Sequence, residues 1–78
     1  MVKYLTLEKH ETLETFKMKF FRIFERSVKN FVIIGEPQKF MGNTKVITLK
    51  DNRSLNKDLV IKIDGPGFLI QELYEELT

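Results

Sequence analysis

The segment from Leu13 to Phe31, LETFKMKFFRIFERSVKNF, decides how this chain folds. When its residues are placed about 100° apart, as in an α-helix, the large apolar side chains gather on one side. These side chains are Leu13, Phe16, Phe20, Ile23, Phe24, Val28 and Phe31. The pattern predicts one long amphipathic helix of roughly 30 Å, which begins between about residues 8 and 12 and ends near residue 30.

The opposite side of this predicted helix is basic. Its cations follow at intervals of three, four and three residues, at Lys19, Arg22, Arg26 and Lys29. Cations along one line can contact successive phosphates of a nucleic acid. These four residues therefore form a candidate site for a nucleic acid or a protein partner. Because any solvated helix carries a charged outer side, contact with water alone is the other interpretation. Met18 lies among these cations and is a further candidate contact residue.

The rest of the chain predicts a small α+β fold in a single domain, residues 1–78. β-favouring runs predict strands at 2–7, 31–34 and 59–63, and further β segments at 39–41 and 44–49 on either side of a tight turn at Gly42-Asn43. Residues 51–57 are expected to form a polar loop. A turn at 64–67 leads into a short helix, in which Pro66 suits the first position. We therefore expect a small antiparallel sheet packed against the long helix, closed by the short C-terminal helix, in the order β-α-β-β-β-α.

The predicted strands are apolar on more than one face. Val46 and Val60 alternate with Ile47 and Ile61, so both faces of the sheet carry aliphatic side chains. One long helix covers only one face. The other face is expected to meet the C-terminal helix or a second copy of the chain, which leaves monomer and homodimer both open.

Charge is unevenly distributed along the chain, although its net value is only +2. Residues 1–16 carry a net charge of −1, residues 17–62 carry +7, and residues 63–78 carry −4. Such segregation bears on association rather than on fold. The acidic C-terminal helix and the basic long helix are expected to dock on each other, within one chain or between two.

An enzyme is not expected. His10 is the single imidazole, and it lies among Glu8, Glu11 and Glu14, where an exposed first-turn histidine is the simplest interpretation. There is no cysteine, and no segment has the residue pattern of a metal site, a phosphate loop or any other cofactor site. We therefore expect no cofactor, no metal and no small-molecule substrate. No apolar run is long enough for a membrane span, so a cytoplasmic location is expected.

The predicted α-β-β-β-α portion is similar in element order to double-stranded RNA-binding domains. In that family the last helix is typically basic at its start, whereas this chain has Gln71, Glu72, Glu75 and Glu76 there. The family's binding residues have no matching positions in this sequence, so none is carried over.

These observations favour a small regulatory or inhibitory protein that acts by protein–protein contact. Cys-free chains of this size, rich in Lys, Ile, Phe and Glu, are common among accessory regulators of phages and mobile elements. The alternative is a nucleic-acid-binding protein that uses Lys19, Arg22, Arg26 and Lys29.

Overall fold

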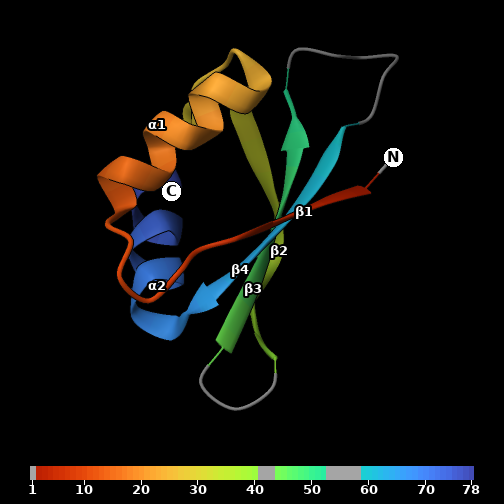
Figure 1. The fold of residues 1–78 in the computed structure, drawn as a ribbon. Coiled ribbons are helices and arrows are strands. Elements are labelled where there is room, and N and C mark those ends of the chain that lie inside the picture. The colour runs from red at the N-terminus through yellow and green to blue at the C-terminus, as the bar shows by residue number, and fades with distance from the viewer. Residues whose placement is uncertain (1, 41–43, 53–58) are drawn as a thin grey trace.

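A computed structural model describes residues 2–40, 44–52 and 59–78 (Figure 1). The elements are β1 (Val2–Thr6), α1 (Leu13–Phe24), the short 3-10 turn η1 (Val28–Asn30), β2 (Phe31–Phe40), β3 (Thr44–Asp51), β4 (Val60–Pro66) and α2 (Gly67–Leu77). The predicted α+β class is confirmed, and the elements follow one another as predicted with η1 added. The predicted turn at Gly42-Asn43 and most of the polar loop after Asp51 lie outside the described residues.

The four strands form a mixed sheet in the order β1-β4-β3-β2. Strands β2, β3 and β4 pair antiparallel, whereas β1 pairs parallel with β4, from Val2 opposite Val60 to Thr6 opposite Asp64. The prediction of a wholly antiparallel sheet is therefore wrong at this edge. The chain between β1 and β4 contains α1, β2 and β3. This long connection allows the parallel pairing, because parallel strands cannot be joined by a tight turn.

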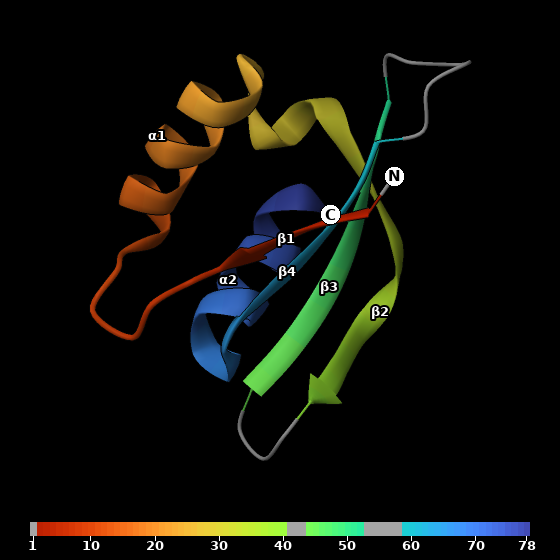
Figure 2. The same cartoon turned by 45° about the vertical axis from the view of Figure 1, so that its right-hand side comes forward.

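Both helices lie on the same side of the sheet (Figures 1 and 2). Helix α2 packs across β2, β3 and β4, whereas α1 stands to one side and contacts α2 and η1. The buried stripe of α2 is Leu69, Ile70 and Leu73. The prediction that the sheet packs mainly on the N-terminal helix is therefore wrong, because α2 occupies that position.

Helix α1 ends at Phe24, so the predicted continuation to about residue 30 is wrong. Glu25 adopts the left-handed conformation, with φ of 55°, and its N–H donates to the carbonyl of Phe21. Ser27 then caps the short turn η1. The helix has to stop here because Phe31 already lies in β2, opposite Asp51. Within the described residues, no helix is long and apolar enough to cross a membrane.

The start of α1 follows the sequence prediction more closely. Thr12 is the N-cap: its hydroxyl accepts from the N–H of Thr15 at 3.2 Å, and the Thr15 hydroxyl accepts from the N–H of Thr12 at 3.1 Å. This reciprocal capping box satisfies two N–H groups that have no partner within the helix. Glu14 in the first turn adds a favourable interaction with the helix dipole.

Aromatic rings join α1 to the sheet. Phe20 is fully buried, and its ring centroid lies 4.7 Å from that of Phe24 and 5.2 Å from that of Phe31. Phe16 extends the cluster at 6.1 Å from Phe20. Aromatic pairs at these separations add about 0.5–1.5 kcal/mol beyond the area they bury. Ile23, which the periodicity places on the same side, is instead 51% exposed.

The chain after β1 passes directly over the end of β4. The N–H of Leu7 donates to the carbonyl of Asp64 at 2.7 Å, and the side chain of Leu7 is buried against Gly65. A Cβ on Gly65 would lie 2.6 Å from the Cβ of Leu7 and 3.1 Å from its carbonyl oxygen. Glycine at residue 65 is therefore required by this close approach.

We expect Gly65→Ala to lower the free energy of unfolding by about 1–3 kcal/mol, because the new methyl group forces the Leu7 backbone away from β4. Urea unfolding followed by circular dichroism measures this change. Lys62→Ala, at an exposed position of the same strand, is the control and should stay within about 0.5 kcal/mol of the wild type. Equal stability of the two variants would contradict the close approach.

Candidate functional site

The structure separates the four basic residues that the sequence places on one line. Lys19 and Arg22 lie on α1, Arg26 follows the end of the helix, and Lys29 lies in η1. Because the backbone turns at Glu25, the helical spacing does not continue to Arg26 and Lys29. The four side chains therefore do not form a single helical stripe.

Lys19 is engaged within its own chain. Its ammonium group lies 2.9 Å from the carboxylate of Glu11, whose side chain is only 10% exposed. Burial raises the pKa of Glu11, but the N–H of Glu8 and the ammonium of Lys19 donate to its carboxylate and hold the pKa below its usual value. This ion pair fixes the turn before α1 against the helix.

Arg26 is paired with Asp51, which is the buried charged residue of the described chain. The side chain of Asp51 is 3% exposed, and it lies at the end of β3. The pair ties the segment after α1 to the sheet. Sequence reasoning placed Asp51 in a polar loop and missed this partner, because nothing in the local sequence indicates the pairing.

The remaining basic residues lie on different sides of the molecule. Arg22 and Lys29 are exposed in the helical layer, whereas Lys62 is exposed on the sheet. The side chains of Lys39, Arg53 and Lys57 lie outside the described part of the chain.

The face of the sheet opposite the helices is uncovered by any described element (Figures 1 and 2). Residues of even number point to this face, because their odd-numbered neighbours in β3 and β4 are buried beneath the helices. The pairing register arranges the outer side chains in rows across the four strands, and in two of these rows every side chain is described. One row is Val2, Val60, Lys50 and Val32, and the next is Tyr4, Lys62, Thr48 and Ile34.

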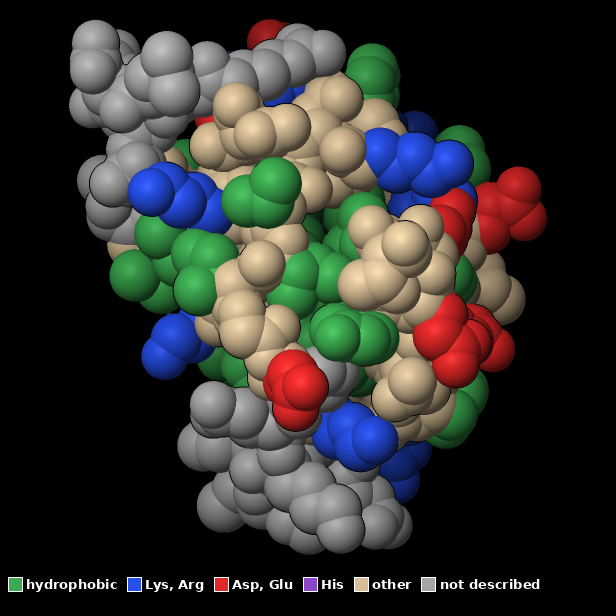
Figure 3. All heavy atoms as spheres, turned by 180° about the vertical axis from the view of Figure 1, so that it is seen from behind, with side chains coloured by type: hydrophobic (Ala, Val, Ile, Leu, Met, Phe, Trp, Pro, Cys, Tyr) green, Lys and Arg blue, Asp and Glu red, His purple; other side chains and the backbone are tan. Residues whose placement is uncertain are grey.

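This uncovered sheet face, defined by those two rows, is largely apolar at its edges. Val2 and Tyr4 on β1 are 58% and 51% exposed, and Val32 and Ile34 on β2 are 42% and 45% exposed. Seen from behind, hydrophobic side chains with a few basic ones among them occupy much of the sheet side, whereas most acidic side chains lie on the side of the helices (Figure 3). The predicted aliphatic second face is present. Of the two occupants predicted for it, the C-terminal helix is excluded, because α2 packs on the opposite face.

Tyr4 and Asp64 form a polar pair on this face. The pKa of Tyr4 is raised from its ordinary value of 10.0 to about 12, first by its hydrogen bond to the Asp64 side chain, then by burial and by the charge of Asp64. One carboxylate oxygen of Asp64, Oδ1, is buried without a hydrogen-bond partner among the described residues. The side chain of Asp64 is therefore partly buried, whereas that of Lys62 on the same strand is exposed.

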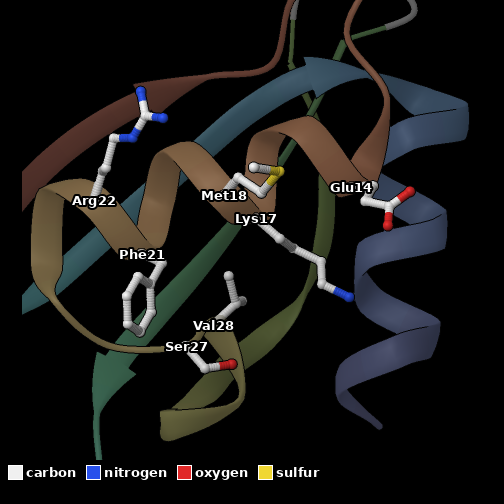
Figure 4. Close-up of a pocket in the computed structure, with 7 residues that line it drawn as sticks. All are labelled: Glu14, Lys17, Met18, Phe21, Arg22, Ser27 and Val28. Atoms are coloured by element: carbon white, nitrogen blue, oxygen red, sulfur yellow. The ribbon is translucent and has the colours of Figure 1, made fainter.

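A second feature is a groove of about 450 Å³ on the outer side of α1 (Figure 4). Met18, Phe21 and Val28 provide its apolar lining, and Lys17 and Arg22 border it. Met18 is 61% exposed and Phe21 is 57% exposed. The sequence singled out Met18 by its place among the cations, but it gave no sign that Phe21 is exposed.

The described residues contain no group of three or more His, Cys, Asp or Glu side chains that could hold a metal ion. His10 is exposed in the turn between β1 and α1.

No protein-family model matches this chain, and neither curated proteins nor solved structures give a significant match to it.

We expect Arg26→Met to lower the free energy of unfolding by about 1–3 kcal/mol, because the buried carboxylate of Asp51 loses its charged partner. Arg22→Met removes an exposed cation and should stay within about 0.5 kcal/mol of the wild type. Urea unfolding of the two variants at neutral pH tests the difference. Similar losses for both would show that Arg26 has no special structural role.

The Tyr4–Asp64 pair predicts a stability change at alkaline pH. Because the folded-state pKa of Tyr4 is above 10.0, its contribution to stability is complete below pH 10 and is lost as the pH rises toward 12. Ultraviolet titration of the phenolate should show one tyrosine with a raised pKa, absent in Tyr4→Phe. In Asp64→Asn the pKa of Tyr4 should return toward 10; an unchanged titration curve would exclude the carboxylate as the cause.

Proposed function

We propose that this protein is a non-enzymatic regulatory or inhibitory protein that acts by binding another protein through the uncovered sheet face. One observation carries the proposal: both helices lie on one side of the sheet, and exposed aliphatic and aromatic side chains remain on the other. Contiguous exposed apolar patches of this kind are typical of protein-interaction sites.

The chemistry of the face indicates the kind of partner. Lys62 lies between Tyr4 and Thr48 in the middle of a row and is exposed, whereas Asp64 is partly buried. The accessible charge is therefore positive and is flanked by apolar side chains. A protein surface that combines apolar side chains with carboxylates complements it.

A second copy of the chain is a poorer occupant of this face. Self-association would bring the positively charged middle of one face toward that of the other, and like charges across an interface cost several kcal/mol. The nucleic-acid alternative has less support, because Lys19 and Arg26 already pair with carboxylates of the same chain.

The test is capture of the partner with immobilised protein, followed by affinity measurement with the purified partner. We expect Ile34→Glu to weaken binding at least about tenfold, because it places a carboxylate where an apolar contact is made. Lys62→Glu should weaken it through charge reversal. Glu72→Lys, at an exposed position of α2 on the opposite side of the molecule, is the matched charge-reversal control and should bind as the wild type.

Two outcomes would contradict the proposal. One is full binding by both sheet-face variants with loss in Glu72→Lys. The other is binding of random DNA or RNA with a steep loss of affinity as salt increases, which indicates phosphate contacts; loss of that binding in Arg22→Glu would assign it to the basic helix residues.

A further inference from the structure

Helix α1 carries a stripe of exposed residues that face away from the sheet. Glu14, Met18 and Arg22 follow at intervals of four residues, so they lie on one side of the helix. Phe21 lies beside Met18, and both are more than half exposed. An unburied methionine and phenylalanine side by side on a helix are unusual for a surface that meets only water.

The charges of this α1 stripe are arranged symmetrically about Met18. Glu14 lies in the first turn of α1 and Arg22 lies in the last turn. If a second α1 lies antiparallel across the first and the two cross at Met18, Glu14 of each helix faces Arg22 of the other. A parallel arrangement would instead bring Glu14 against Glu14, so the charge pattern specifies the antiparallel orientation.

The neighbouring lysines are compatible with this pairing. An antiparallel crossing at Met18 brings Lys17 of one helix near Lys19 of the other. Lys17 is paired with Glu76, and Lys19 is paired with Glu11, within each chain. Their charges are therefore compensated before the helices meet. Within the described residues, Glu14 and Arg22 have no ion-pair partner of their own.

We propose that a second copy of this chain docks on the α1 stripe and forms a two-fold symmetric, antiparallel helix pair centred on Met18. The same residues contribute from both copies, as a two-fold interface requires. The groove between Phe21 and Val28 receives the apolar side chains of the partner helix (Figure 4). This proposal is independent of the uncovered sheet face, which lies on the other side of the molecule.

The contact is small, so the expected affinity is modest. One helix pair buries less than the roughly 800 Å² per partner of a standard interface, which favours micromolar rather than nanomolar association. Sedimentation equilibrium from about 10 µM to about 1 mM covers this range. A wild-type chain that stays monomeric throughout would overturn the proposal.

A cysteine substitution tests the position of the two-fold axis. The chain contains no cysteine, so Met18→Cys introduces a unique thiol. Helices packed about 8–10 Å apart, with Cα atoms about 2.3 Å from each axis, bring facing Cα atoms within reach of a disulfide. Mild oxidation should convert Met18→Cys to a covalent dimer. Ile23→Cys, exposed on another side of α1, is the matched control and should remain largely monomeric.

Charge reversal tests the orientation. Arg22→Glu places glutamates opposite Glu14, and Glu14→Arg places arginines opposite Arg22; each variant alone should dimerise at least about tenfold more weakly. An equimolar mixture of the two variants restores both opposite-charge pairs and should form a heterodimer with affinity near that of the wild type. Circular dichroism establishes that each variant is folded.

Several results would exclude this interface. They are a wild-type dimer unaffected by both reversals, a mixture that stays monomeric although its components are folded, and equal cross-linking of the Met18→Cys and Ile23→Cys variants. Any of them would show that self-association, where it occurs, uses another surface.

Discussion

The packing of α2 across β2, β3 and β4 is the contact on which the rest of this structure depends. Leu69, Ile70 and Leu73 of α2 are almost completely buried in the core that covers one face of the sheet. Once α2 occupies this central position, α1 has room only at its side, and the other face of the sheet remains uncovered by the described chain. Both candidate contact surfaces, the uncovered sheet face and the α1 stripe, follow from this division.

Ion pairs add to the contacts that hold α1 in its position beside α2. Besides the phenylalanine cluster, ion pairs connect α1 and its flanking turns to the rest of the molecule: Lys17 with Glu76 of α2, Lys19 with Glu11, and the nearby Arg26 with Asp51. Exposed pairs contribute little to stability, whereas the pair that includes buried Asp51 depends strongly on both partners. Basic residues that resemble a binding stripe in the sequence are thus partly structural; of the four, Arg22 and Lys29 are exposed and form no ion pair among the described residues.

The sequence predicts burial in this region better than it predicts backbone conformation. Val28 and Phe31 are buried, as the helical periodicity implies, but they lie in a 3-10 turn and a strand. The helical periodicity of the sequence gives no indication of the left-handed turn at Glu25, because no glycine or proline marks this turn. The Thr12 cap was predictable from local chemistry. The partner of Arg26 was not, because Asp51 lies 25 residues away in sequence and meets it only in the folded chain.

The parallel pairing of β1 with β4 also constrains the order of folding. The two antiparallel hairpins β2–β3 and β3–β4 join neighbouring segments, whereas β1 waits for residues near the other end of the chain, and such distant pairings carry the larger entropic cost. During synthesis β1 is made before β4, so it acquires its described sheet neighbour only after β2 and β3 have been made. Val2 and Tyr4 belong to this late-docking strand, so the uncovered sheet face becomes a complete surface only when folding ends. Docking of β1 on β4 is thereby the step that completes the surface proposed for partner binding.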